Sequence, residues 1–260
     1  MIVGAGRALA FLFRWRYAGE PRLERVSVRI PSLPAHLHGF TIGVLSDLHL
    51  GPIVSTKYIR AAAASLAAEK PDLVVVVGDL VTEERAAAEL EYALGPVRGA
   101  FAVPGNWDIG KPAALQSSAV QWLVNRGVEA APGLWLAGTD DWLLGEPDLD
   151  QAVAGAPEEA VRVLLAHEPQ AADRVEARHR VDLVISGHTH GGQIRLPFIG
   201  PVLLPAGGRR YVAGLYSSRD CQVYTSRGLG VAHLPVRVLC PPELTLLRLV
   251  QDVPAPAEGR

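Results

Sequence analysis

The stretch LVVVVGD (residues 73–79) is an unbroken apolar run that leads into a glycine and an aspartate. Strands with one wet face alternate apolar and polar residues, and this run does not, so we expect a strand that is covered on both faces. Such a strand is typical of a largely parallel sheet with another layer packed on each side. The run also ends on Asp79, whose carboxylate is a side chain able to hold a metal ion.

Four further stretches have the same form, in which an apolar run stops at a possible metal ligand. They are FTIGVLSDLH (40–49), GAFAVPGNWD (99–108), VRVLLAHE (161–168) and VDLVISGHTH (181–190). Together the five endings supply the donors Asp47, His49, Asp79, Asn106, His167, His188 and His190. Any one motif is weak, because a lone histidine is more often a structural core residue than a ligand. Five in order favour a metal site at the rim where the strands end.

Helical patterns separate these runs. Residues 55–70 begin with a serine cap and are rich in alanine, and residues 82–94 begin with a threonine followed by acidic residues. Further helices are predicted over residues 112–125 and, shorter, over residues 168–177. Alternating strands and helices imply right-handed crossovers and an α/β fold with a mainly parallel sheet. After Gly191, short runs between glycine- and proline-rich turns predict a second, more antiparallel sheet.

Composition narrows the class of protein. The 260 residues are 49% hydrophobic and 20% charged, so the chain can bury a sizeable core. With 25 basic and 27 acidic residues the formal net charge is -2, and we expect no nucleic-acid partner. Two cysteines, Cys221 and Cys240, cannot form a disulfide framework. They suit a reducing compartment, which favours a cytoplasmic protein.

The two ends of the chain differ from the middle. We expect an N-terminal segment over residues 1–22, one domain over residues 23–252 and a tail over residues 253–260. The run ALAFLF (8–13) is far shorter than the roughly 20 residues of a membrane span. The sequence RWRY follows it at once, and aromatic and basic residues beside an apolar run favour peripheral contact with the cytoplasmic membrane. A terminal helix packed on the domain, or a frayed end, is the alternative.

The five endings together resemble the motifs D-x-H, GD, GNH-[DE], H and GH-x-H of the calcineurin-like metallophosphoesterase superfamily. The match spans residues 40–193, and the block SGHTHGGQIRLPFIG (186–200) is specific. This block, with LLAHEP and TSRGLG (225–230), resembles a bacterial subgroup of small, often membrane-associated phosphoesterases. The resemblance implies a four-layer αββα sandwich for the metallophosphoesterase domain, in agreement with the α/β alternation.

The resemblance also implies a binuclear metal site. The first metal ion would be held by Asp47, His49 and His190. The second would be held by Asn106, His167 and His188, with Asp79 as the bridge. Carboxylates and imidazoles without a thiolate suit Mn first, with Fe, Zn, Mg or Ni as alternatives. A hydroxide that bridges two such ions would attack phosphorus, so no protein nucleophile is needed.

Trp107 departs from the superfamily pattern, which has a histidine directly after the metal-binding asparagine. That histidine protonates the leaving oxygen or steadies the transition state, and an indole N–H does not titrate in the useful range. General-acid help is worth ~10²–10⁴ in rate, so we expect weak cleavage of ordinary alkyl esters. Phosphodiester or pyrophosphate bonds with good leaving groups are favoured. A nucleotide-sugar or nucleotide-lipid such as UDP-2,3-diacylglucosamine is one candidate substrate. The alternative is a metal-binding scaffold that acts through protein partners.

Contacts to the substrate are less clearly marked. Trp107 could stack on a base or cover an acyl chain, with simple packing over the metal rim as the alternative. Arg195 could clamp a phosphate, or be an ordinary surface arginine. The apolar loop LPFIGPVLLPAGG (196–208) could receive a lipid tail or touch a bilayer, or it could be a hairpin tucked against the second sheet. His233 lies outside the motifs and is expected to be structural or exposed.

Overall fold

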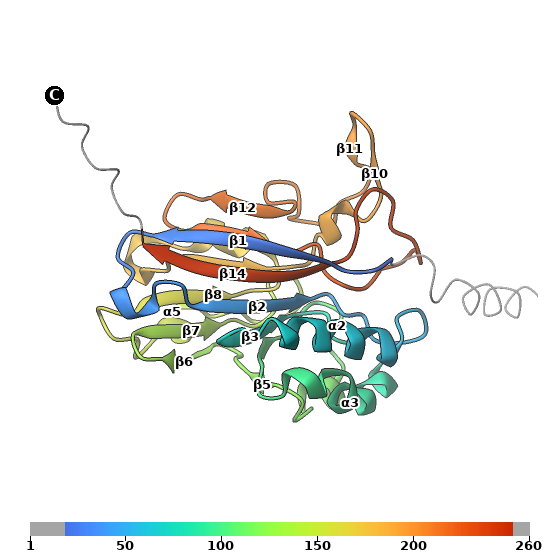
Figure 1. Cartoon of the computed structure of the whole chain (residues 1–260), viewed down its shortest axis with the longest axis horizontal. Helices are drawn as coiled ribbons and strands as arrows, with labels where there is room; N and C mark the ends of the chain where they lie inside the picture. The colour runs from blue at the N-terminus through green and yellow to red at the C-terminus, as the bar shows by residue number, and fades with distance from the viewer. Residues whose placement is uncertain (1–18, 252–260) are drawn as a thin grey trace, which may run out of the picture.

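A computed structural model of the chain describes residues 19–251, and two six-stranded sheets form its centre (Figure 1). The first sheet has the order β1 (Arg22–Ile30), β14 (Glu243–Gln251), β2 (Thr41–Ser46), β3 (Leu73–Val77), β4 (Phe101–Val103) and β5 (Gln121–Trp122). Strands β2 to β5 are parallel to one another, as are β1 and β14, and β14 meets β2 antiparallel. The first sheet is therefore mostly parallel, as the strand–helix alternation predicts.

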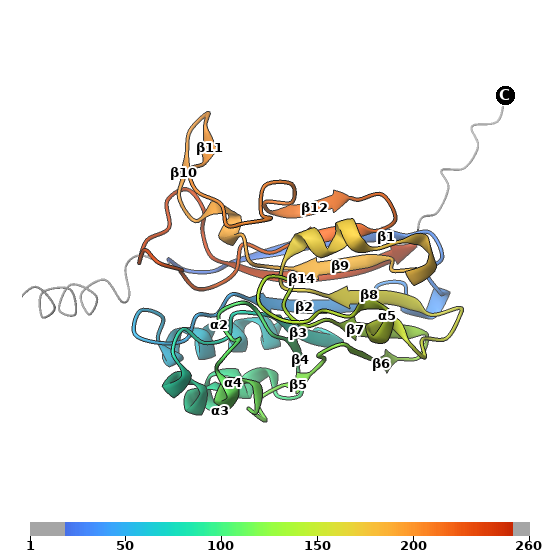
Figure 2. The same ribbon diagram turned by 180° about the vertical axis from the view of Figure 1, so that it is seen from behind.

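The second sheet has the order β12 (Gly214–Ser217), β13 (Gln222–Thr225), β9 (Leu183–Ser186), β8 (Val161–Leu165), β7 (Leu134–Gly138) and β6 (Arg126–Ala131). Its four central strands are parallel, and only the two edge strands run antiparallel to their neighbours. A short hairpin of β10 (Arg195–Leu196) and β11 (Gly200–Pro201) projects away from both sheets (Figures 1 and 2).

Helices form the two outer layers. Helix α2 (Thr56–Ala68), the 3-10 segment η2 (Glu84–Glu89), α3 (Leu90–Leu94), η3 (Gly95–Val97) and α4 (Pro112–Leu115) cover the first sheet. Helix α5 (Leu149–Val153), η4 (Pro169–Arg174) and η5 (Ala177–His179) lie on the second sheet. The remaining 3-10 turns among the described residues are η1 (Ala35–Leu37) and η6 (His190–Gly192). The predicted four-layer αββα sandwich is thus confirmed.

The main core lies between the two sheets. On β3, Val75 and Val77 point into this core, and Val76 points into the core beneath the helices. Facing them from the second sheet are apolar residues such as Leu136 and Val163. Both faces of β3 are therefore buried, which explains why LVVVV contains no polar residue.

Local sequence predicts α2 well and the next two helices poorly. Ser55 caps α2 by accepting a hydrogen bond from the backbone N–H of Tyr58 (3.3 Å). Thr82 does not start a helix, because its hydroxyl donates to the carbonyl of His49 (3.0 Å), and a 3-10 segment precedes α3. Over residues 112–125 the predicted helix stops at Leu115. The chain then becomes β5, where the backbone N–H of Gln121 donates to the sheet (2.8 Å to Ala100 O).

The prediction of a second, more antiparallel sheet formed after Gly191 is wrong. The late strands divide between the two sheets. Strand β14 inserts between β1 and β2 of the first sheet, and β12 and β13 extend the edge of the second. The short helix predicted over residues 168–177 forms only in part, as the 3-10 turn η4 and the first residue of η5, with extended backbone at Val175 and Glu176 between them. Both cysteines are buried free thiols.

Candidate metal centre

The seven predicted donors come together where the strands of both sheets end. Asp47 and His49 follow β2, Asp79 follows β3 and Asn106 follows β4, all in the first sheet. The second sheet contributes the other three donors from the ends of β8 and β9: His167, His188 and His190. The rim that the sequence predicts is therefore shared between two facing sheets. Six of the seven side chains are buried, and Asn106 is half-buried.

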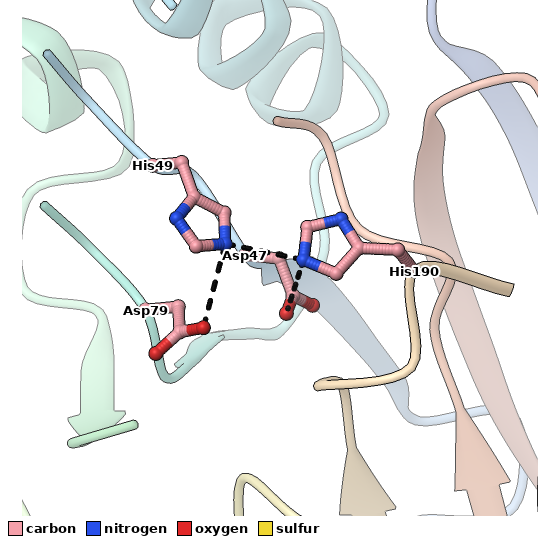
Figure 3. A group of neighbouring side chains, drawn as sticks. All are labelled: Asp47, His49, Asp79 and His190. Atoms are coloured by element: carbon pink, nitrogen blue, oxygen red, sulfur yellow. Dashed lines mark hydrogen bonds and ion pairs between the residues drawn. The ribbon is translucent and has the colours of Figure 1, made fainter. Parts of the chain in front are cut away.

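Asp47, His49, Asp79 and His190 form the first cluster of donors (Figure 3). Each offers an atom within 4.8 Å of the others. The Nε2 atoms of His49 and His190 are 3.1 Å apart, and His190 Nε2 is 3.4 Å from Asp47 Oδ1. His49 Nε2 is also 3.4 Å from Asp79 Oδ2. Two imidazole nitrogens and carboxylate oxygens converging on one point suit a divalent cation.

The second cluster joins His167, His188 and Asn106 to the same aspartate. Asn106 Oδ1 is 3.1 Å from His188 Nδ1, and His167 Nε2 is 3.3 Å from Asp79 Oδ2. The same oxygen of Asp79 is thus close to His49 in the first cluster and to His167 in the second. This is the position that a bridging carboxylate would need between two ions.

Backbone carbonyls orient the histidine rings. His167 Nδ1 is 3.0 Å from the carbonyl of Val77, which leaves Nε2 buried without a hydrogen-bond partner. His188 Nε2 is 3.2 Å from the carbonyl of Ala206, which leaves Nδ1 to face Asn106. A ring nitrogen held as a donor by a carbonyl presents the lone pair of the other nitrogen, as metal-binding histidines require. The donor set fits a pair of metal ions on this evidence.

The backbone is also shaped at the donors. Five of them have left-handed φ angles: Asp47 (50°), His49 (46°), Asp79 (54°), His188 (70°) and His190 (51°). Residues other than glycine rarely adopt this region, and such residues gather at functional sites. These five residues follow β2, β3 and β9, so the chain turns sharply just beyond the ends of these three strands.

Burial and neighbouring charges shift the pKa values of the donors in opposite directions. Burial raises the pKa of Asp47 to about 6. Burial would also raise the pKa of Asp79, but the His167 imidazole holds it below its usual range. Burial alone would lower the pKa of His167, yet the carboxylates of Asp79 and Asp47 raise it well above the ordinary value. Burial lowers the pKa of His49 and of His188 to about 4. The lowered pKa values of His49 and His188 favour the neutral imidazoles that metal binding needs, whereas His167 must lose a proton when an ion binds.

The Trp107 side chain lies over the first cluster. Its ring meets the His49 ring edge-on, with centroids 5.3 Å apart. Its backbone N–H donates to Asp79 Oδ1 (2.8 Å), and its carbonyl accepts from the ammonium of Lys111. The indole also contacts the exposed ring of His233, and the centroids of these two rings are 5.4 Å apart. The sequence assigned no role to His233, and nothing in its local pattern indicates that it reaches this place.

Three further residues support the centre, and the motifs do not mark them as ligands. Asp108 is buried and accepts hydrogen bonds from the backbone N–H groups of Leu80 (3.0 Å) and Gly105 (3.0 Å). It thereby ties the Asp79 loop to the Asn106 loop. Burial raises the pKa of Asp108 to about 7.

Glu168 is the second of these residues. It is buried, its Oε1 has no hydrogen-bond partner, and it forms a compact group with His167 and His188. Burial raises the pKa of Glu168 to about 8, because the His167 imidazole offsets only part of the desolvation. It is an additional oxygen donor on the side of the second cluster.

Arg237 is the third, and it holds the loop behind His190. Its guanidinium donates to the carbonyls of Gly230 (2.7 and 2.9 Å) and Arg227 (2.7 Å), and Nη2 lies 3.3 Å from His190 Nδ1. One side chain therefore joins the TSRGLG segment to the GHTH loop. The sequence does not indicate this role, because Arg237 lies 47 residues from His190 and belongs to no motif.

Arg195 lies at the first residue of β10, and its Nη1 donates to the carbonyl of Gly191 (3.0 Å), next to His190. Its role toward phosphate stays a prediction. Among the other arginines near the site, Arg210 pairs with Asp173 (2.7 Å) and Arg227 with Glu243 (3.0 Å).

The family model of the calcineurin-like phosphoesterases matches residues 40–192, the part that carries all seven donors. The chain belongs to this family. A Bacillus subtilis relative, the uncharacterized metallophosphoesterase YkuE, is 32% identical over 252 residues, which cover 90% of this chain and 88% of that protein. Phosphodiesterase YaeI of Escherichia coli is 34% identical over 258 residues, covering 92% and 93%. The chain is thus a metallophosphoesterase, a hydrolase of phosphoric esters, with residue clusters that could hold metal ions.

A Danio rerio relative is a transmembrane protein with a metallophosphoesterase domain. It is 32% identical over 260 residues, which cover 90% of this chain but 58% of that protein. Within residues 19–251 no helix combines the length and the apolar character that a membrane crossing requires. Most of the predicted N-terminal segment, residues 1–18, and the tail from residue 252 lie outside the described residues.

Proposed function

We propose that the chain is a binuclear metallophosphoesterase that cleaves phosphodiester or pyrophosphate bonds with good leaving groups. Asp47, His49 and His190 would hold one ion, Asn106, His167 and His188 the other, and Asp79 would bridge them. The convergence of both clusters on Asp79 Oδ2 supports this division. Two divalent cations, Mn as the first choice, would supply an activated water and neutralise charge on the phosphate oxygens.

The chain's own residues hold this site in place. Asp47 accepts the backbone N–H of His188 (2.9 Å) and Asp79 accepts that of Trp107 (2.8 Å), so each carboxylate is oriented by a loop of another strand. Arg237 fixes the back of the His190 loop through Nη1, which donates to the carbonyl of His190 (3.3 Å), and Nη2, which lies 3.3 Å from His190 Nδ1. Prepositioned donors need little rearrangement when an ion and a phosphate bind, which is how such sites lower the barrier.

Trp107 is the observation that carries the leaving-group preference. Its indole occupies the place directly beside His49 and cannot donate a proton to a departing alkoxide. An alkoxide leaves slowly without a proton, whereas a phosphate or an aryloxide leaves readily as an anion. A nucleotide-sugar or nucleotide-lipid pyrophosphate such as UDP-2,3-diacylglucosamine fits this preference, and an indole could also stack on its base. The name of the relative YaeI, a phosphodiesterase, supports diesters as the other class.

The test is hydrolysis by Mn-loaded protein of an aryl phosphodiester, an alkyl monoester and a nucleotide pyrophosphate. Trp107→His should raise alkyl-ester turnover by ~10²–10⁴ and change pyrophosphate turnover far less. Trp107→Phe is the matched control, because it keeps an aromatic ring beside His49 but supplies no acid. Equal gains on both substrates would show that position 107 does not govern leaving-group protonation.

His233 allows a second check, since its ring contacts the indole. We expect His233→Ala to leave the ratio of alkyl-ester to pyrophosphate turnover unchanged, and a fall in this ratio would show that His233 supplies the proton in place of the missing histidine. The alternative function, a scaffold that works through protein partners, predicts no turnover of any substrate by protein with both metal ions bound. Turnover abolished by Asp79→Asn would exclude the scaffold.

A further inference from the structure

The hairpin of β10 and β11 exposes large apolar side chains to water. Phe198 at its tip is completely exposed, and Ile199 and Leu203 are 73% and 77% exposed. Leu196 and Val202 are also exposed. The expectation of a hairpin tucked against the second sheet therefore does not hold, because the hairpin projects from the body (Figures 1 and 2). Clusters of this kind mark a binding surface rather than ordinary surface residues.

A second loop extends this apolar surface. Leu234 and Leu239 are exposed, and the loop is bound to the base of the hairpin by two backbone hydrogen bonds of 2.9 Å, Arg195 N to Val238 O and Val238 N to Gln193 O. Gln193 adds a side-chain bond to the carbonyl of Leu234 (2.9 Å). The hairpin and the loop thus form one surface with a fixed base.

Arginines flank this apolar surface in the sequence. Residues 196–208 contain no charged side chain, and Arg195 lies before them and Arg209 and Arg210 after them. Arg210 is paired with Asp173 (2.7 Å), so the positive charge offered to headgroups rests on Arg195 and Arg209. The described chain begins beside the same loop, since Gly19 lies against Pro242. The sequence that precedes it, residues 1–18, carries three arginines and no acidic residue. An apolar tip with basic residues at its base suits an anionic bilayer, because the tip can enter the hydrocarbon while the basic residues meet the anionic headgroups.

We propose that this surface inserts into the interface of an anionic lipid bilayer. The hairpin starts five residues after His190, and on its way back Ala206 O contacts His188 Nε2 (3.2 Å). At the outgoing end, Arg195 Nη1 donates to the carbonyl of Gly191 (3.0 Å), the residue after His190. The metal centre would therefore lie at headgroup depth when the hairpin tip is inserted. Presentation of a lipid-linked phosphate to this centre rests on the proposed function, whereas bilayer binding does not. The substrate class would be amphiphiles with a phosphodiester or pyrophosphate headgroup.

Vesicle flotation of the full chain tests the surface. Wild type should bind vesicles of phosphatidylglycerol and phosphatidylcholine at least several-fold better than pure phosphatidylcholine. The triple variant Phe198→Ser, Ile199→Ser, Leu203→Ser should lose roughly 100-fold or more in partitioning. Tyr92→Ser with Val124→Ser is the matched control. Both residues are exposed, and α3, which carries Tyr92, lies on the opposite side from the hairpin (Figure 1). Vesicle binding by the triple variant equal to that of wild type would overturn the proposal and point to residues 1–18.

A spectroscopic variant locates the contact directly. Phe198→Trp, compared with wild type, should gain emission that shifts to the blue and is quenched by brominated lipid only when vesicles are present. A blue-shifted signal without vesicles would overturn the proposal, because the tip would then be covered by a second copy or another part of the chain. Hydrolysis of a soluble aryl diester should be equal in all variants. If the wild-type protein does not hydrolyse the aryl diester, the proposed function is refuted, but the bilayer surface is not.

Discussion

Gly105→Ala gives the sharpest test of how closely the two sheets approach at the centre. A Cβ at this position would lie 2.4 Å from Asp79 Oδ1, 2.5 Å from Asp79 N and 2.8 Å from His167 Cδ2. Ordinary contacts are 3.4–4 Å, so the new atom is about 1 Å too close to the backbone nitrogen and to the carboxylate of Asp79. The φ angle of Gly105 is not in the left-handed region, so any effect comes from the added atom.

Overpacking of this kind costs about 1–3 kcal/mol, which corresponds to a Tm lower by about 2–12 °C for a domain of this size. Displacement of Asp79 and His167 should also weaken Mn binding by roughly 10–100-fold. Calorimetric melting of the metal-free protein measures the first effect, and Mn titration the second. Gly95→Ala is the control, because its Cβ would meet the terminal nitrogen of the Arg60 side chain (2.9 Å), which can move aside. A wild-type Tm and a wild-type Mn affinity in Gly105→Ala would refute close packing between Gly105 and the Asp79 loop.

Three further results are expected. Although burial opposes it, the Asp79 carboxylate raises the pKa of His167 well above its ordinary value, so metal binding must displace a proton from this imidazole. Mn affinity should therefore rise from pH 6 to 8, and binding heats should depend on the ionisation enthalpy of the buffer; heats independent of the buffer would contradict this assignment. Arg237→Lys should cost about 1–3 kcal/mol in denaturant unfolding and speed metal loss, because a lysine cannot reach the same carbonyls, whereas Arg210→Lys at the surface should stay within about 0.5 kcal/mol. Asp108→Asn should lower the free energy of unfolding by about 1–3 kcal/mol, because the amide NH₂ would face backbone N–H groups that now donate to the carboxylate. An unchanged denaturant unfolding curve would show that Asp108 does not tie these loops together.

Where sequence reasoning failed, it failed at residues whose conformation is decided by distant partners. Residues 119–123 continue a helical pattern, but the open edge of the first sheet offers hydrogen bonds to Gln121 and Leu123, and the strand forms. The sequence of β14 reads as one more strand of a late sheet, yet it pairs with β1 and β2, which precede it by some two hundred residues. Sheet membership depends on partners that no local window contains.

The sequence by itself determined the strands that are covered on both faces, the seven donors and the break at Trp107. These features are local: a doubly buried strand must be apolar throughout, and a ligand at its end must carry the right atom. The tertiary structure decided the rest. Packing of two sheets brings His188 against Asp47, 141 residues apart, and sets Arg237 and His233 beside the centre. It also leaves an apolar hairpin exposed, because burial is a property of the folded surface and not of the residues that form it.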